Sequence, residues 1–177
     1  MAEALDPALP GEIDTLAKQV LQEACLRGLR LATAESCTGG LLASLLTDVP
    51  GSSHAFERGF VVYTEDAKHE LLGVGRELIE AHTAVSEPVA RAMAEGALAG
   101  SRADIAVSIT GYADTSTDPA HPGGLVHFAA ARTGQSTVHR KEEFGPKGRA
   151  VIRIACLRAA LELFRDQLVG KIETAAQ

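Results

Sequence analysis

The spacing of apolar residues predicts a long helix near each end of the chain. From Ile13 to Ala24, apolar residues recur at the i, i+3, i+4, i+7 spacing of an amphipathic helix, and Gly28 is a stop signal. The same spacing predicts a last helix from about Arg149 to Gln167. Shorter helices are expected over residues 39–46, 66–72 and 77–82, and behind the capping sequence Ser86-Glu87-Pro88.

Short runs of β-branched and other apolar residues alternate with these helices. We expect strands at Leu29–Ala34, Gly59–Tyr63, Asp104–Thr110, Leu125–Arg132 and Ser136–Phe144. A turn over residues 133–135 joins the last two as a hairpin, so these two are antiparallel. The alternation predicts an α/β fold: a three-layer α/β/α sandwich with a mixed, mostly parallel sheet of about five strands, one of them antiparallel.

The length of the chain, 177 residues, indicates one domain at the usual ~150 residues per domain. Its 46% hydrophobic and 23% charged residues are typical of a globular protein. Residues 1–10 carry no apolar period. We therefore expect a frayed N-terminus over 1–10, a single domain over 11–167 and a C-terminal tail over 168–177.

Charge and apolar runs exclude several function classes. Lys and Arg number 17 against 23 Asp and Glu, so the net charge is −6, which argues against a surface that binds nucleic acid. Aromatic residues make up only 4% and Trp is absent, which leaves few platforms for stacking bases. No apolar run approaches the ~18 residues of a membrane span, so we expect a cytoplasmic protein with no membrane partner.

The cysteines and histidines show no ligand spacing. The three cysteines are far apart and odd in number, and they form no CxxC pair, so neither a disulfide framework nor a zinc site is indicated. The six histidines are scattered along the chain. We therefore assign no metal and no cofactor.

Three polar, glycine-bearing segments follow predicted strands, at the edge of the sheet where open α/β folds bind ligands. They cover residues 35–40, 63–68 and 111–124. The first places Ser36, Cys37 and Thr38 on a strand-to-helix turn, and Gly39 and Gly40 open the helix. Free N–H groups at a helix start can hold a phosphate or stabilise an oxyanion. The alternative is that Ser36 or Thr38 simply caps the helix.

Further candidate residues each have a structural alternative. Lys68 follows the next strand and, if desolvated, can serve as the base that Ser36 needs, or it is a solvated surface lysine. Tyr63 can donate to a substrate, or it is a half-buried strand residue. Cys37, near a helix N-terminus, is a rival nucleophile or a buried structural cysteine. Arg149 and Arg153, four residues apart on one helix face, can grip a phosphate or form a solvated basic face.

Residues 33–40 read TAESCTGG, which closely resembles the signature of the CinA C-terminal domain family, the nicotinamide-mononucleotide deamidases. Similar segments follow in the family's order: PGSS at 50–53, FERGFVVY at 56–63, AK at 67–68, LGV at 72–74, AVSEPVA at 84–90 and ADIAVSITG at 103–111. The resemblance spans about residues 12 to 166. It is to the stand-alone form, without the second domain that some members carry.

The resemblance implies a three-layer sandwich and a reaction. Family enzymes hydrolyse the carboxamide of nicotinamide mononucleotide to nicotinate mononucleotide and ammonia, without a cofactor. The family's nucleophile corresponds to Ser36, its basic lysine to Lys68 and its site tyrosine to Tyr63. Residues 37–40 (Cys37, Thr38, Gly39 and Gly40) correspond to its oxyanion and phosphate loop. Substrate-binding positions fall on Thr110, Gly111, Arg149 and Arg153, the arginines if one residue is inserted before them.

One segment departs from the family pattern. After the third strand the family reads G.AGP..GG…KPVG.V, whereas here Asp114-Thr115 replaces Gly-Pro, the middle Gly-Gly is missing and His121 replaces Lys. Glycine at such a position permits close approach of a ligand, and an Asp adds a side chain and a negative charge. An alternative function is therefore a catalytically impaired member that binds a nucleotide-like ligand or a protein partner. For the enzyme we expect a small-molecule nucleotide substrate, and we expect a homo-oligomer.

Overall fold

The computed structural model describes residues 9–170, which form a five-stranded mixed sheet. The strands are β1 (Leu31–Glu35), β2 (Phe56–Val61), β3 (Ile105–Gly111), β4 (Leu125–Arg132) and β5 (Val138–Glu143), in the order β2-β1-β3-β4-β5. Strand β1 pairs in parallel with β2 and β3, whereas β4 is antiparallel to both β3 and β5. Four strands therefore share one direction and β4 alone opposes them, which confirms the expected sheet.

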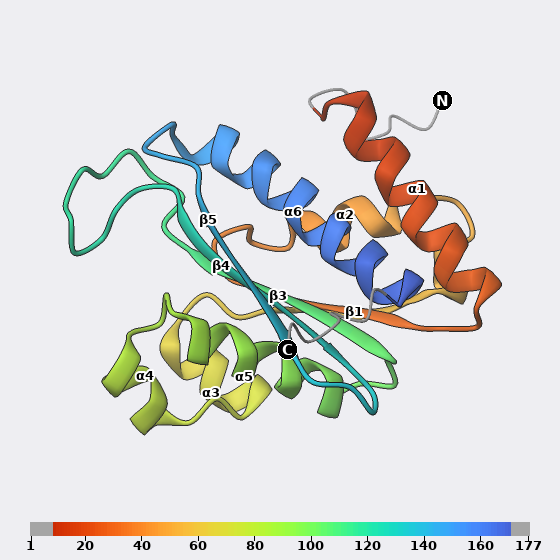
Figure 1. The fold of residues 1–177 in the computed structure, drawn as a ribbon, viewed down its shortest axis with the longest axis horizontal. Coiled ribbons are helices and arrows are strands. Elements are labelled where there is room, and N and C mark those ends of the chain that lie inside the picture. The colour runs from red at the N-terminus through yellow and green to blue at the C-terminus, as the bar shows by residue number, and fades with distance from the viewer. Residues whose placement is uncertain (1–8, 171–177) are drawn as a thin grey trace, which may run out of the picture.

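Helices cover both faces of the sheet and complete the three-layer sandwich (Figure 1). One face carries α1 (Gly11–Leu26), α2 (Leu41–Thr47) and α6 (Arg149–Val169). The other carries α3 (Glu65–Leu72), α4 (Arg76–His82) and α5 (Glu87–Ala99). A short 3-10 helix, η1 (Ser52–His54), precedes β2. Between residues 9 and 170, no helix is both long and apolar enough to cross a membrane.

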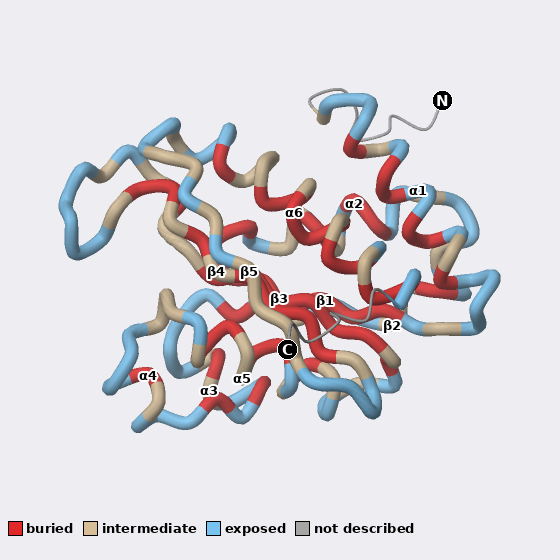
Figure 2. The backbone as a smooth tube through the Cα atoms, viewed as in Figure 1, coloured by how far each residue is buried: buried red, intermediate tan, exposed pale blue. Residues whose placement is uncertain are grey.

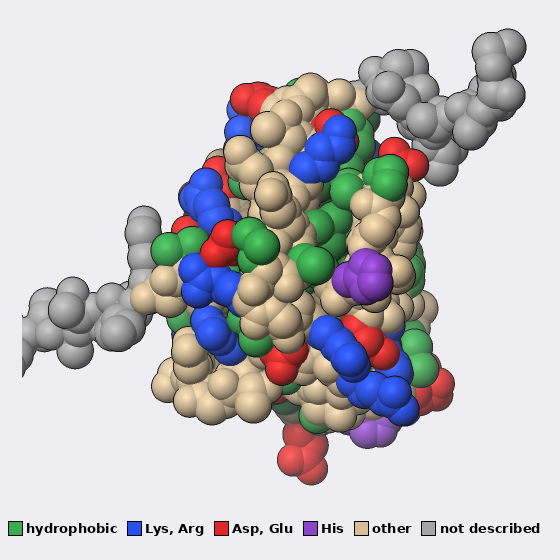
Figure 3. All heavy atoms as spheres, turned by 90° about the vertical axis from the view of Figure 1, so that its right-hand side faces the viewer, with side chains coloured by type: hydrophobic (Ala, Val, Ile, Leu, Met, Phe, Trp, Pro, Cys, Tyr) green, Lys and Arg blue, Asp and Glu red, His purple; other side chains and the backbone are tan. Residues whose placement is uncertain are grey.

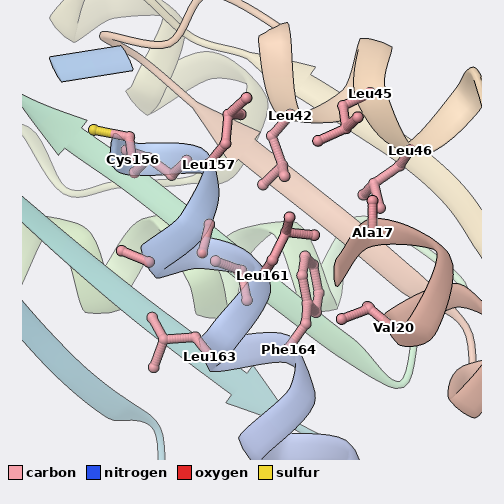
Figure 4. Close-up of a cluster of buried hydrophobic side chains, with 14 of the residues drawn as sticks. Ala17, Val20, Leu42, Leu45, Leu46, Cys156, Leu157, Leu161, Leu163 and Phe164 are labelled. Atoms are coloured by element: carbon pink, nitrogen blue, oxygen red, sulfur yellow. The ribbon is translucent and has the colours of Figure 1, made fainter. Parts of the chain in front are cut away.

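The main core lies between the sheet and the helices α1, α2 and α6 (Figure 2). Helix α6 presents Leu157, Leu161 and Phe164 to residues of α1 and α2, among them Val20 and Leu42 (Figure 4). The core on the opposite face uses smaller side chains, because alanines line the sheet and α5 there. The main core forms as the apolar period predicts, since the periodic positions of α1 from Ile13 to Ala24 are all buried.

Element boundaries differ from expectation where caps decide them. Leu29, expected in the first strand, belongs to the C-terminal cap of α1, where its N–H donates to the carbonyl of Ala24 at 2.9 Å beyond Gly28. Helix α6 ends at Val169, beyond the expected Gln167, because Leu168 is still buried in the core. Residues 1–8 of the expected frayed N-terminus and 171–177 of the expected tail lie outside the described residues.

Candidate active site

The turn over residues 36–40 lies at the carboxyl edge of the parallel strands. It leaves β1 beside β3, where the N–H of Ser36 donates to the carbonyl of Ile109 at 3.0 Å. Gly39 and Gly40 have φ values of 62° and 91°, in the left-handed region that side chains disfavour. The sequence Gly39-Gly40 therefore lets the chain reverse sharply from β1 into α2, and the nucleophile candidate stays at the edge of the sheet.

Ser36 and Lys68 are in contact at this carboxyl edge of the sheet, and both are buried. Lys68 Nζ donates to Ser36 Oγ at 3.0 Å, and the amine also approaches the carbonyls of Val62 at 3.1 Å and Tyr63 at 3.5 Å. Lys68 is 1% exposed and Ser36 is 7% exposed. Lys68 is thus a buried lysine rather than the solvated surface lysine of the alternative interpretation. Its helix, α3, starts at the end of β2 because Thr64 caps it by accepting the N–H of Ala67 at 3.1 Å.

The surroundings of Lys68 favour the neutral amine. Burial lowers the pKa of Lys68 from its usual value, and the charges of Cys37 and Glu65 oppose that shift only in part. Within residues 9–170, no carboxylate forms an ion pair with it. A desolvated amine next to a hydroxyl is the arrangement that a serine nucleophile needs for proton removal.

Tyr63 and Cys37 occupy different settings. The Tyr63 side chain is 65% exposed, and this residue meets Lys68 through its backbone carbonyl. Cys37 is buried in the main apolar core beside Cys156, whose thiol hydrogen bond lowers the pKa of Cys37, while the pKa of Cys156 is raised. Lys68 donates to the Ser36 hydroxyl and not to this thiol. The geometry therefore favours the serine over the cysteine as the activated group.

The first turn of α2 is capped by Glu35, which sequence reasoning missed. One carboxylate oxygen accepts the N–H of Leu42 at 3.0 Å and the other accepts that of Ala43 at 2.8 Å. The interpretation of Ser36 or Thr38 as the cap is therefore wrong. The N–H of Gly39 is also occupied, since it donates to the carbonyl of Ser36 at 3.1 Å. Among the described residues, the amides of Cys37, Thr38 and Gly40 have no backbone acceptor, so three N–H donors remain at this turn.

The four expected substrate-binding residues differ in whether their polar groups are free to bind a ligand. Arg153 donates through Nη2 to the carbonyl of Thr38, and its Nε is buried with no partner among the described residues. Arg149, at the start of α6, is exposed. Thr110 is buried and donates to the carbonyl of Ala84 at 2.8 Å, so its hydroxyl holds the segment before α5. Gly111 packs against β4, because a Cβ there would lie 2.6 Å from a methyl of Val126.

The loop over residues 111–124 is closed at its base by backbone hydrogen bonds between Tyr112 and residues 124–125, and side chains form turns within it. Asp114 accepts the N–H of Ser116 at 2.9 Å, and Asp118 accepts that of Ala120 at 2.9 Å. Tyr112 and His121 meet edge to face with ring centroids 5.3 Å apart. The base of the loop adjoins the turn before α6, where the N–H of Phe144 donates to the carbonyl of Gly124 at 2.9 Å. The segment that departs from the family pattern therefore borders the approach to Arg149.

Two other surfaces show no comparable chemistry. A hollow of about 250 Å³ lies between α1 and residues 49–55, at the opposite edge of the sheet from Ser36, with mostly apolar lining. The face in Figure 3 carries interspersed basic and acidic side chains rather than one continuous basic patch. Among residues 9–170, no three His, Cys, Asp or Glu side chains come together as a metal site. The Ser36 edge is therefore where the buried reactive groups of the described chain converge.

A model of the CinA C-terminal domain matches residues 13–168, nearly the whole described chain. The chain belongs to this family. The nicotinamide-nucleotide amidohydrolase PncC of Escherichia coli K12 is 44% identical over 158 residues, 89% of this chain and 96% of that protein. A competence-damage inducible protein of Symbiobacterium thermophilum is 56% identical over 124 residues, and this chain covers only 29% of it. The competence/damage inducible protein CihA of Agrobacterium tumefaciens superposes with a TM-score of 0.88 at 43% identity, covering 93% of this chain and 99% of that one.

Proposed function

We propose that the protein hydrolyses the carboxamide of nicotinamide mononucleotide to nicotinate mononucleotide and ammonia, with Ser36 as nucleophile and Lys68 as base. The observation that carries this proposal is the 3.0 Å contact between Lys68 Nζ and Ser36 Oγ, in which both groups are buried. The substrate is inferred from the family and from the name of the Escherichia coli relative.

The surroundings of the amine orient its lone pair. A neutral lysine has two N–H bonds, and the carbonyls of Val62 and Tyr63 supply two acceptors for them. In this neutral form the lone pair faces Ser36. The 3.0 Å contact, in which the charged amine donates to Ser36 Oγ, then reverses, and the Ser36 O–H donates to Nζ. Ser36 Oγ attacks the amide carbon as its proton passes to Lys68, and this proton leaves with the departing ammonia. Lys68 then takes a proton from water as the water oxygen attacks the acyl carbon. The bond from that carbon to Ser36 Oγ breaks, and the proton passes from Lys68 to Oγ.

The remaining residues bind the substrate around this pair. The amides of Thr38 and Gly40 are the donors that we assign to the oxyanion of the tetrahedral intermediate. Cys37 and Gly39 shape the turn that presents them. We assign Tyr63, whose side chain is exposed and whose carbonyl approaches Lys68, to contact with the bound nucleotide. Arg149 is the first candidate for the phosphate because it is exposed, whereas Arg153 already holds the Thr38 carbonyl.

Ammonia release from nicotinamide mononucleotide tests the assignment. We expect wild-type protein to release ammonia and Ser36→Ala to lose at least about 10³-fold in rate, because the alanine variant has no nucleophile. Cys37→Ser is the matched control, and we expect it to retain activity. Activity that persists in Ser36→Ala, or that disappears only in Cys37→Ser, would contradict the role of Ser36.

The altered loop favours a second candidate, a family member that binds a nucleotide-like ligand without turnover. Thr115, next to Asp114, lies 3.8 Å from where a Cβ on Gly148 would be, directly before Arg149, so an anionic ligand held by Arg149 would meet an added carboxylate nearby. Calorimetry that shows binding of nicotinamide mononucleotide without ammonia release would support this candidate. The double variant Asp114→Gly, Thr115→Pro should then restore turnover.

A further inference from the structure

We infer that Glu35 is the positioning residue of the catalytic pair: its side chain anchors the turn that carries Ser36, and its backbone anchors the strand end that holds Lys68. This inference rests on the proposed function and assigns a further residue to it. Glu35 makes no contact with Ser36 Oγ or Lys68 Nζ among the described hydrogen bonds, so it acts through the groups that it fixes.

The side chain of Glu35 closes the turn into a ring. Glu35 precedes Ser36, and its carboxylate reaches across residues 36–40 to the amides of Leu42 and Ala43. It is fully buried, so water does not compete for these bonds. Helix α2 has only seven residues and starts from a left-handed Gly40 that offers no side-chain cap. The Glu35 carboxylate is therefore what fixes the start of α2 relative to the end of β1.

The backbone of Glu35 links the same residue to Lys68. Its carbonyl accepts the N–H of Val62 at 2.8 Å. The carbonyl of Val62 in turn accepts from Lys68 Nζ at 3.1 Å. Ser36 is thus covalently next to Glu35, and Lys68 is two hydrogen bonds away. A shift of Glu35 would change the separation of the nucleophile and its base.

Only a carboxylate of this length fits both amides. A carboxylate is an acceptor at both oxygens, whereas a glutamine would aim its NH₂ group at one of the two N–H donors. Aspartate is one methylene shorter and does not reach both. Burial of a carboxylate is unfavourable unless its bonds are satisfied, and Arg153 brings an opposite charge to the other side of the turn, at the Thr38 carbonyl. A leucine or alanine would be more favourable in an apolar core. We therefore infer that the carboxylate is there to fix the position of the turn.

Steady-state kinetics with nicotinamide mononucleotide test this inference. We expect Glu35→Gln to lower kcat by about 10-fold to 100-fold, because a displacement near 1 Å at a reacting pair has effects of that size, with KM changed by less than about 2-fold. Glu35→Ala should lower kcat further. Asp104→Asn is the matched control, since Asp104 accepts the N–H of Arg30 at 2.8 Å at the opposite edge of the sheet. It removes a similar bond and should leave kcat unchanged.

The outcomes separate this inference from the proposed function. If wild-type protein releases no ammonia, the proposed substrate is wrong. The role of Glu35 is then tested by the rate at which a fluorophosphonate labels Ser36, and slower labelling in Glu35→Gln than in wild type supports that role. Equal kcat in wild type and Glu35→Gln, or a loss no larger than in Asp104→Asn, overturns it.

A measurement on wild-type protein covers the case in which Glu35 variants do not fold. Amide hydrogen exchange should show strong protection of Leu42 and Ala43, although amides in the first turn of a helix usually exchange fast. The amide of Glu77 in the first turn of α4, a helix without a side-chain cap, gives the comparison. Exchange at Leu42 and Ala43 as fast as at Glu77 would overturn the inference.

Discussion

Two buried regions of this molecule are built on opposite principles. Where α6 packs on α1 and α2, the buried cluster drawn in Figure 4 is apolar, with Phe164 and Leu161 set among leucines, valine and alanine. At the carboxyl edge of the sheet, the buried residues include Glu35, Ser36 and Lys68. Both regions exclude water, but only the first gains free energy from doing so.

We interpret the difference as stability exchanged for reactivity at the proposed site. The carboxyl edge leaves Thr38 Oγ1 and Arg153 Nε buried without a partner among the described residues, and it needs two glycines in the left-handed region. Such features are unfavourable for folding and collect at functional sites. The apolar cluster on the same face of the sheet supplies the stability that holds them. Substitutions at the carboxyl edge should therefore change activity more than stability, and substitutions in the apolar cluster should change stability more than activity.

The largest effect is expected when Lys68 is replaced. Lys68→Met should lower ammonia release by about 10²-fold to 10⁴-fold, because the variant lacks the proton acceptor that we propose for Ser36. The free energy of unfolding at pH 7 should not fall, since an apolar side chain removes a buried amine of lowered pKa. Urea unfolding and ammonia assays measure both. A variant destabilised by more than about 2 kcal/mol would show that Lys68 contributes to stability and would weaken the comparison.

A substitution in the apolar cluster should lower stability and leave the activity of the folded protein unchanged. Phe164→Ala should lower the free energy of unfolding by about 3 to 5 kcal/mol, through lost burial and the cavity that remains. The fraction that stays folded should keep the wild-type kcat. Val169→Ala, on the same helix but 56% exposed, is the control and should stay within about 0.5 kcal/mol of wild type. A large loss of kcat in folded Phe164→Ala would mean that the two regions are coupled.

The fold could be predicted from sequence because each helix or strand is indicated by residues within or next to it. The period of α1, the cap at Ser86 and the hairpin at 133–135 each depend on neighbouring residues. The cap of α2 could not be predicted, because Glu35 acts seven residues away across a glycine turn, while capping rules examine the residues directly before a helix. The order of strands suggested that Lys68 could come near Ser36, because each residue follows one of two successive strands. Sequence alone left the solvated surface lysine as the alternative, since spacing does not fix where a side chain points.

Gly39 tests the carboxyl edge itself, with a smaller effect. Gly39→Ala should lower the free energy of unfolding by about 1 to 3 kcal/mol, because φ is 62° and a Cβ would lie 2.9 Å from Arg153 Nη2. Activity should fall as well, since Arg153 holds the Thr38 carbonyl. Gly134→Ala has φ of 75° and open space around the added Cβ, so it shares the backbone strain without the contact. Equal effects of the two variants on stability and activity would show that the Arg153 contact is unimportant.

The smallest expected effect comes from a polar pair on the α5 face. His127 Nδ1 and His139 Nε2 lie 2.9 Å apart, and burial, together with the neighbouring positive charges, lowers the pKa of both imidazoles from 6.5. The unfolded chain therefore binds more protons than the folded protein as pH falls below about 6.5. The stability of the folded state should be fully present above that pH and decline below it.

Urea unfolding between pH 5 and pH 8 measures this decline, and the double variant His127→Gln, His139→Gln should lose most of it. Glu87 lies 3.4 Å from His139 and favours protonation, which keeps the expected effect small. If the wild type and the double variant show the same slope below pH 6.5, the histidine pair does not contribute. An activity that changes in the double variant at pH 8 would show instead that polar groups on the α5 face are coupled to the Ser36 edge, and the contrast between the two regions would then have to include this face.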